Sequence, residues 1–586
     1  MKLNIRALLA LLIFAAGAAH ADAESDFAGL LADHWEWRMA TAPVWSSMLG
    51  DRRYNDQWSD NSLAGIERQH RETREFLRRT YAIDRSALTA ENQLNYELFR
   101  RQLQDDVDSY PFNGHLMPFS SRGGVQNIES LTDRIRLATV ADFEDWLSRI
   151  EKLDVLIERE IDLAEAGRKR GIMPPRVLMQ RVPDQLKLQL VEQPQDSPLF
   201  AVFKNMPEEF SAADRERLRA RAADAIEDKA LPAFRKLDRY FNGTYLPATR
   251  DSVGLSELPN GNAWYEHLTQ SFTTTRMTPD EVHRLGLQEV QRIRDAMQQI
   301  IDEVGFEGDF QAFLTFLRTD PQFYYETPEE LHEAYLATCK RIDPELVKLF
   351  GKLPRMPYGV KPIPDSIAPD TTTAYYTRPA ADGSRAGIYW VNLYRPEVRP
   401  KYEIEVLSVH EAMPGHHLQL ALQQELDGMP DFRRFIGFTA FVEGWGLYSE
   451  RLGYDLGLYQ DPYSRFGQLT YDMWRAVRLV VDTGMHYKGW SRQQAIDFFK
   501  ENAAKAEHDI VNEIDRYIGN PGQALAYKVG QLKIIALRER AQRELGDRFD
   551  IRAFHDELLG AGALPLDLLE QRMDAWLTAQ FAAAAP

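Results

Sequence analysis

Helical periodicity runs through most of this 586-residue chain and limits the folds that it can adopt. In long stretches, apolar residues recur at spacings of three and four with charged residues between them, as in amphipathic helices. Thr278 and Thr327 each precede a proline and two acidic residues, which is typical of a capped helix start. The sequence therefore predicts a mainly helical protein. The clearest predicted helices are residues 142–166, 212–241, 279–304 and 327–349.

Residues 351–400 differ from the rest of the chain. Prolines are frequent there, and the segments TTTAYYTRP and RAGIYWVNLYRP are rich in β-branched and aromatic residues. The turn signal ADGS separates them. These features predict a small β-hairpin in which residues 372–377 pair with residues 387–393. We expect helix to resume near Pro400.

The N-terminus has the features of a secretory signal peptide. Lys2 and Arg6 precede an apolar run over residues 8–16, and Ala19 and Ala21 form a small-x-small cleavage site. The run is shorter than the ~20 residues that a membrane span needs, and no later segment is a better candidate. We expect cleavage after Ala21 and a periplasmic or secreted protein. The residue directly after the cleavage site is Asp22 and not a cysteine, which argues against a lipoprotein.

Composition limits the partners. Cys339 is the only cysteine, so no internal disulfide can form and the core must supply the stability. The net charge is −18, and it becomes −20 once the signal peptide removes Lys2 and Arg6. Nucleic acids and anionic membranes require a basic surface, so neither is an expected partner. The sequence leaves the oligomeric state open.

The stretch HEAMPGHHLQ, residues 410–419, begins like the zinc motif His-Glu-x-x-His but has proline where the second histidine should stand. The motif works because residues four apart share one helix face. His410 and His416 are six apart and would point away from each other on a regular helix. His417 is seven residues from His410 and would lie ~10 Å along the axis.

An interruption at Pro414 and Gly415 would solve this problem. Proline breaks the helical hydrogen-bond ladder, and glycine accepts unusual dihedral angles. If Met413 and Pro414 loop out, the i, i+4 relation of the histidines is restored, and His416 becomes the favoured second ligand. His417 remains an alternative ligand or a neighbouring group. A buried histidine cluster without metal remains the other interpretation.

A third ligand is expected on the segment FTAFVEGWGLYSERLGYDL, which reads as a second helix after a turn. Glu443 lies 27 residues beyond His416, a gap that fits a helix, a turn and a returning helix. Its apolar neighbours suggest burial, and a buried carboxylate needs a partner or a metal. Glu450 is the alternative ligand, or an outer group that orients a histidine.

These motifs resemble a known group of enzymes. A His-Glu pair, a second histidine and a Glu on a later helix look like the helical gluzincin metallopeptidases, which include the thimet oligopeptidase and angiotensin-converting enzyme groups. HEAMPGHH, EGWGLYSE and PGQALAYKVG closely resemble the bacterial family called domain of unknown function 885. The resemblance implies one large helical domain over residues 22–586, with lobes at about 22–360 and 361–586. It also implies a deep cleft, one zinc ion per chain and short peptide substrates.

The resemblance also implies roles for individual residues. Glu411 would act as general base, and Tyr527 would donate to the oxyanion, with Tyr517, His486 and Lys528 as alternatives. Arg478 could grip a substrate carboxylate, or form a structural row of ion pairs with Arg475 and Asp482. A strand of the hairpin could pair with an extended peptide. The full set of candidate substrate contacts is Tyr376, Tyr389, Arg478, His486 and Lys528.

Three functions fit these features. The first is an exported zinc-dependent peptidase that acts on short peptides. The second keeps the metal site but hydrolyses non-peptide amides. The third is a noncatalytic exported binding protein on the same scaffold. Retention of the general base Glu411 favours an enzyme over a binding protein.

Overall fold

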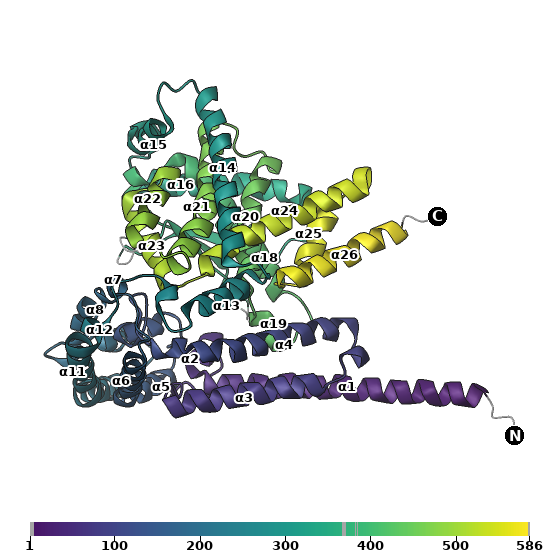
Figure 1. Cartoon of the computed structure of the whole chain (residues 1–586). Coiled ribbons are helices and arrows are strands. Elements are labelled where there is room, and N and C mark those ends of the chain that lie inside the picture. Colours follow the sequence, from purple (N-terminus) through teal and green to yellow (C-terminus); the bar gives the residue numbers. More distant parts are fainter. Residues whose placement is uncertain (1–4, 366–367, 369–370, 381–382, 384, 584–586) are drawn as a thin grey trace. The chain divides into compact units, whose positions relative to one another are not determined.

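The computed structural model describes residues 5–365, 368, 371–380, 383 and 385–583, with side chains described from residue 22 to residue 582 of these ranges. The chain divides into two compact units (Figure 1). Unit 1 comprises Met1–Ser252 and Leu258–Asn260, and unit 2 comprises Val253–Glu257 and Gly261–Pro586. Both are built mainly of helices, as predicted. The expected lobe boundary near residue 360 falls inside unit 2, because helices before it pack on helices after it.

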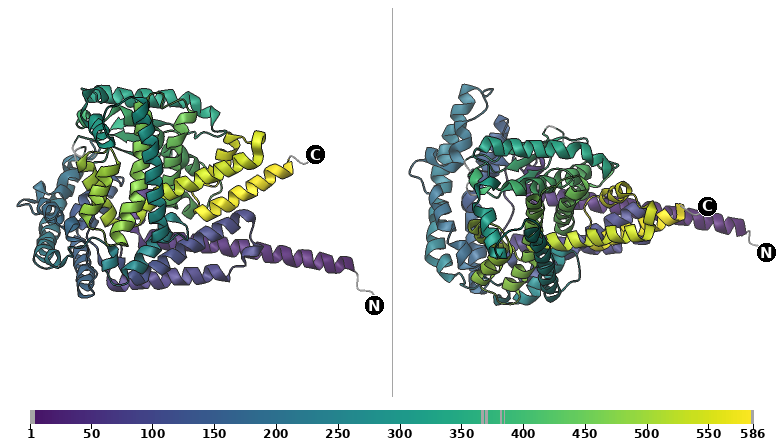
Figure 2. Two further views of the ribbon diagram at one scale, coloured as in Figure 1. Left: turned by 45° about the horizontal axis from the view of Figure 1, so that its top comes forward. Right: turned by 90° about the horizontal axis from the view of Figure 1, so that it is seen from above.

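Unit 1 contains twelve α-helices within the described residues. Helices α1, α3 and α4 run side by side, and Figure 2 shows them from two further directions. Rings of Phe27, His34, Phe76 and Phe99 pack between them. The helices are α1 (Ile5–Thr41), α2 (Pro43–Leu49), α3 (Leu63–Ala82), α4 (Ala90–Ser109), α5 (Val140–Ile150), α6 (Leu153–Lys169), α7 (Arg176–Met179), α8 (Val182–Gln189), α9 (Ala201–Lys204), α10 (Ala212–Ala225), α11 (Leu231–Tyr240) and α12 (Leu246–Ala248).

The predicted signal peptide overlaps the start of α1, and its first four residues lie outside the described residues. Its cleavage stays a prediction. Of the helices in the described part of the chain, none has both the length and the apolar character needed to cross a membrane.

The predicted helices are present, with three differences in detail. The helix expected over 327–349 is α-helical only as far as Ile342 and continues as a 3-10 helix over Asp343–Lys348. The capping boxes at Thr278 and Thr327 are confirmed, because each threonine hydroxyl accepts from the backbone three residues on. The helix expected over 142–166 is divided between α5 and α6. The one expected over 212–241 contains a π-helical turn between α10 and α11.

The long helix α21 lies at the centre of unit 2. Every residue of α21 from Arg475 to His486 is buried, and α14 packs along it (Figure 1). The helices of unit 2 are α13 (Gly261–Thr273), α14 (Pro279–Glu303), α15 (Phe310–Thr319), α16 (Pro328–Ile342), α17 (Ile404–Glu411), α18 (His416–Gln424), α19 (Asp431–Phe435), α20 (Thr439–Asp455), α21 (Pro462–His486), α22 (Arg492–Asn502), α23 (Glu507–Gly519), α24 (Ala526–Leu545), α25 (Ile551–Leu559) and α26 (Leu566–Ala583).

The sheet of unit 2 has three strands in the order β1-β3-β2. The predicted hairpin is confirmed: β2 (Ala374–Thr377) pairs antiparallel with β3 (Gly387–Val391), so that Tyr376 lies opposite Tyr389. Strand β1 (Tyr358–Pro362), which pairs in parallel with β3, was not predicted. Its sequence YGVKP contains glycine and proline, both unfavourable in strands. Because β3 is hydrogen-bonded on both sides, the expectation that residues 387–393 could pair with a peptide is wrong.

The buried His555 on α25 links two neighbouring segments of unit 2. The Tyr448 hydroxyl lies 2.8 Å from Nε2, and the Leu349 carbonyl lies 2.9 Å from Nδ1. The carbonyl can only accept, so Nδ1 carries the proton and Nε2 accepts from the tyrosine. Burial, the largest influence, lowers the pKa of His555 from 6.5 to about 3. The neutral ring is therefore the form that the fold stabilises.

We predict that His555 makes unit 2 less stable in acid. Its contribution is fully present above pH 6.5, because the ring is then neutral in both states, and it is lost as the pH falls towards about 3. The loss reaches about 2 kcal/mol at pH 5. Urea unfolding at pH 7 and pH 5 should show that His555→Gln reduces this pH dependence. The exposed His508, changed to Gln, is the control and should leave it unaltered. Equal pH dependence in all three proteins would contradict the prediction.

Candidate metal centre

The motif helix is interrupted where the sequence predicts it. Helix α17 ends at Glu411 and α18 begins at His416, and the residues between them leave the helical path. The Met413–Pro414 peptide bond is cis. The backbone N–H of His417 donates to the Ala412 carbonyl at 3.1 Å, so the chain regains the helix after a tight loop. The interruption turns the imidazole of His416 towards that of His410.

His410, His416 and Glu443 converge on one point. The Glu443 Oε2 atom lies 3.8 Å from Nε2 of His410 and 3.5 Å from Nε2 of His416. One ligand atom from each of the three side chains lies within 4.8 Å of the others. With metal–ligand bonds of about 2.0–2.2 Å, tetrahedral zinc ligands lie about 3.3–3.5 Å apart. The spacing therefore fits one zinc ion, and its binding stays a prediction.

Helix α20 approaches the imidazoles closely because Gly446 has no side chain. A Cβ atom at Gly446 would lie 2.9 Å from Cε1 of His410 and 3.2 Å from Cε1 of His416. The neighbouring Trp445 indole donates a 2.9 Å hydrogen bond to the Pro414 carbonyl. One turn of α20 thus fixes the loop between α17 and α18 and presents Glu443 to both histidines.

A second layer of charge orients His410. Its Nδ1 atom lies 2.8 Å from Oε1 of Glu450, and the Arg475 guanidinium lies 3.2 Å from the same oxygen. Glu450 is fully buried. Of the two roles predicted for Glu450, the structure therefore supports the second, an outer group that orients a histidine. Burial lowers the pKa of His410, but hydrogen bonds to Glu443 and Glu450 outweigh burial and raise that pKa to about 9.

The two histidines also act on Glu443. Burial would raise the pKa of this carboxyl group, but hydrogen bonds to His410 and His416 outweigh that effect and hold the pKa well below its usual range. Glu443 is therefore ionised. Two carboxylates, those of Glu443 and Glu450, therefore face the two imidazoles.

His417 lies outside this cluster. Its Nδ1 atom is 2.7 Å from the Tyr376 hydroxyl, and its Nε2 atom is 3.0 Å from the Met356 carbonyl. Both ring nitrogens are thus engaged at the sheet. Burial, the largest influence, lowers the pKa of His417 to about 4, so the ring is neutral. The geometry places His416 at the centre and makes His417 the anchor between α18 and the sheet.

Glu411 stands beside the centre at the end of α17. It is half-buried, and no described side chain or backbone group pairs with its carboxylate. A carboxylate in this setting is open to water.

Three residues predicted to contact the substrate or its oxyanion lie on neighbouring helices: Arg478 on α21, Tyr517 on α23 and Tyr527 on α24. The Arg478 guanidinium carbon is 4.3 Å from the ring centre of Tyr527, and its Nε donates to the Tyr517 hydroxyl at 2.7 Å. That hydroxyl donates its own proton to Glu513 at 2.7 Å. Tyr517 is therefore unable to donate to a substrate, and Tyr527 remains the candidate. Burial and then the Glu443 charge raise the pKa of Tyr527, so it keeps its proton.

Three other side chains predicted to contact substrate are fully buried in unit 2, which corrects that prediction. Lys528 is fully buried, with its ammonium 2.6 Å from Asp472, and His486 is fully buried with Nε2 3.0 Å from the Tyr517 carbonyl. Tyr389 is buried on the central strand β3. These side chains face the interior because their helices and strand pack on every side. The predicted row of Arg475 and Arg478 with Asp482 is also absent from the described contacts, since each arginine pairs with another helix.

Sequence reasoning missed the parts of α20 that hold the centre together. Gly446 and Trp445 lie in the segment EGWG, from which the sequence predicts only that the surroundings of Glu443 are apolar. Gly446, three positions after Glu443, is the feature of the sequence that indicates a close approach of this helix to the histidines. It faces the histidines because three residues make nearly one helical turn.

The fold and the centre define a mainly helical protein with a small sheet and a His, His, Glu cluster on an interrupted helix. The chain belongs to the family described as bacterial protein of unknown function (DUF885), whose model matches residues 43–573. A crystal structure of a "putative lipoprotein" from Colwellia psychrerythraea matches with a TM-score of 0.87 and 28% identity, over 95% of this chain and 99% of that one.

A second structure shows the same fold at lower identity. It is a "putative lipoprotein of unknown function" from Shewanella oneidensis, with a TM-score of 0.74 and 18% identity, over 93% of this chain and 99% of that chain. Comparison with curated proteins gave no match.

We predict that the wild-type protein holds one zinc ion per chain and that His416→Ala loses it. Removal of one of three ligands should weaken zinc binding more than the roughly 10–100-fold expected for an outer group such as Glu450. His417→Ala should keep the zinc, because both of its nitrogens bind elsewhere. Elemental analysis of the purified variants measures this. Zinc lost with His417 and kept without His416 would reverse the assignment.

We also predict that Gly446→Ala weakens zinc binding by at least about tenfold, since the added methyl group meets both imidazoles. Gly437→Ala is the matched control near the start of α20, because a Cβ atom there meets no atom within 4 Å. Zinc competition titration gives both affinities. Equal affinities for the two variants would show that the close approach at Gly446 is unimportant.

Proposed function

We propose that this protein is an exported zinc-dependent peptidase that hydrolyses short peptides. The observation that carries the proposal is the convergence of His410, His416 and Glu443 at distances suited to one zinc ion. The unpaired carboxylate of Glu411 beside them supports a hydrolytic role. The resemblance of HEAMPGHH and the later Glu443 to the gluzincin metallopeptidases points to the same chemistry.

Zinc would supply the polarisation of the scissile carbonyl and would lower the pKa of the attacking water. The chain's own residues perform the proton transfers. Glu411 accepts a proton from the water and returns it to the departing amine. The Tyr527 hydroxyl donates a hydrogen bond to the oxyanion, and its raised pKa keeps that proton in place. Arg475 and Glu450 act behind His410 and hold its ring in one orientation.

The substrate would approach from the side of the sheet. Strand β2 is an edge strand, and its Tyr376 contacts His417 on α18. An extended peptide can add to such an edge by backbone hydrogen bonds. Arg478 is buried, so it would act through its stacked partner Tyr527, whose ring it holds in place, rather than by direct contact with the substrate.

Export is proposed from the N-terminal sequence together with the relatives. The segment up to Ala21 has the features of a signal peptide. Both solved relatives are described as putative lipoproteins, a class of exported or envelope protein.

We predict that Glu411→Gln abolishes peptide hydrolysis while zinc remains bound. The amide keeps the size of the side chain but cannot accept the proton, and loss of a general base costs about 10²–10⁴-fold in rate. Turnover of a short-peptide library, with zinc content measured on the same samples, tests this. Glu405→Gln is the control, because this residue lies on the same helix and its carboxylate accepts from Arg341 and from the Tyr459 backbone N–H.

The outcomes distinguish the alternatives. Full activity in Glu411→Gln would overturn the mechanism. Zinc binding without peptide turnover, but with turnover of simple amides, would favour the non-peptide hydrolase. Zinc-free wild-type protein that binds peptides would favour the noncatalytic binding protein.

A further inference from the structure

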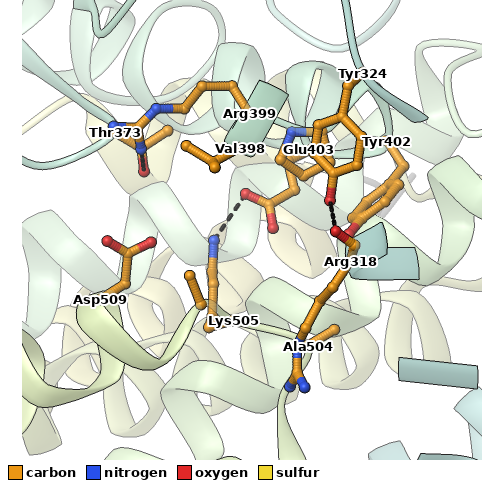
Figure 3. Close-up of a pocket in the computed structure, with 12 residues that line it drawn as sticks. Arg318, Tyr324, Thr373, Val398, Arg399, Tyr402, Glu403, Ala504, Lys505 and Asp509 are labelled. Atoms are coloured by element: carbon orange, nitrogen blue, oxygen red, sulfur yellow. Dashed lines mark hydrogen bonds and ion pairs between the residues drawn. The ribbon is translucent and has the colours of Figure 1, made fainter. Parts of the chain in front are cut away.

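Unit 2 contains a second polar site, a cavity of about 110 Å³ near the N-terminal end of α17. It lies between the segment that leads into α17 and the start of α23, and none of its lining residues belongs to the metal centre (Figure 3). Five of the lining side chains carry charge: Arg318, Arg399, Glu403, Lys505 and Asp509. A cavity of this size holds about four water molecules, at roughly 30 Å³ each.

Two of these charges form a fixed, buried pair. The ammonium of Lys505 lies 2.7 Å from the Glu403 carboxylate, and each residue is more than nine-tenths buried. Lys505 also lies 4.4 Å above the ring centre of Tyr471, whose hydroxyl donates to Glu403 at 3.2 Å. The pair is therefore held in one geometry. Figure 3 shows both charged groups pointing into the cavity.

The other three charges make no direct ion pair among the described contacts, although the carboxylate of Glu507 acts on Arg318 and that of Glu397 acts on Arg399 over a longer distance. Among the described residues, no acid pairs with Arg399, which reaches only the Thr373 hydroxyl and the Tyr394 carbonyl. No described group pairs with the carboxylate of Asp509, which enters the cavity from α23. Arg318 binds the Ala503 carbonyl, and burial lowers its pKa. The cavity therefore offers unpaired positive and negative groups together.

We propose that this cavity binds a free α-amino acid with a small side chain. The ligand carboxylate would meet Arg399 and Lys505, and the ligand ammonium would meet Asp509. Arginine and lysine bind carboxylates through charge-assisted hydrogen bonds, and a carboxylate does the same for an ammonium group. The volume admits a molecule of about six heavy atoms, so both charged ends must belong to one small molecule.

Other ligand classes fit the lining less well. A metal ion would meet three cationic side chains. A phosphate would meet the carboxylates of Glu403 and Asp509. A peptide would place its two charged ends too far apart for one cavity of this size. The inference does not require the metal centre to be active, because the two sites share no residue.

Isothermal titration of the full-length protein with L-alanine tests the proposal. We expect one site with a dissociation constant of about 1 mM or tighter. L-alaninamide lacks the carboxylate and N-acetyl-L-alanine lacks the ammonium, so each should bind at least about tenfold more weakly. These probes test the wild-type protein without any substitution.

Two variants test which side chain binds each charged end of L-alanine. Arg399→Gln should weaken L-alanine binding about tenfold or more and leave L-alaninamide unaffected, because the amide never used that arginine. Asp509→Asn should weaken L-alanine similarly and leave N-acetyl-L-alanine unaffected. Arg395→Gln is the matched control, since this exposed arginine of the same segment pairs with Glu397 outside the cavity.

One further variant separates this site from the metal centre. His416→Ala should bind L-alanine as the wild type does, whatever its zinc content. Loss of binding in His416→Ala would place the ligand at the metal centre and overturn the proposal. Absence of binding to wild type at concentrations far above 1 mM, or equal binding of all three probes, would also overturn it. Failure of the proposed peptidase activity changes none of these outcomes.

Discussion

The close approach of α20 to the interrupted motif helix is the constraint on which the candidate centre depends. Gly446 leaves room for the rings of His410 and His416, and Trp445 holds the loop between α17 and α18 through the Pro414 carbonyl. The same turn of helix presents Glu443. The interruption alone would only redirect His416. The glycine and the indole of α20 convert this change of direction into three side chains aimed at one point.

Buried charge on α21 fixes how the surrounding helices are oriented. Arg475 reaches Glu450 on α20, Asp472 reaches Lys528 on α24, and Arg478 reaches α23 and the ring of Tyr527. An unpaired charge in such a core would be costly, so each helix must present its partner at the right angle. Lys528 and Tyr527 are neighbours on α24. The buried pair therefore sets the position of the proposed oxyanion donor without taking part in chemistry.

The two polar sites of unit 2 stand at opposite ends of α17. Glu403 precedes the helix and lines the small cavity. Glu411 is the last residue of the helix and stands beside the metal centre. The residues between them are almost all buried. Tyr471 and Arg475, one turn apart on α21, contact Glu403 and Glu450 respectively. Tyr471 and Arg475 thus lie between the two sites, and the charges of Glu403 and Glu450 both act on the Tyr471 hydroxyl.

The sequence by itself determined the helical fold, the hairpin, the interruption at Met413–Pro414 and the segment that carries Glu443. These follow from local rules, namely periodicity, caps, turn residues and the backbone limits of proline and glycine. Tertiary structure alone decided that His416 faces Glu443 and His417 faces the sheet, and that Lys528 and His486 point inwards. It also decided the role of Gly446. The direction of a side chain depends on which helices pack around it, and those neighbours are distant in the sequence.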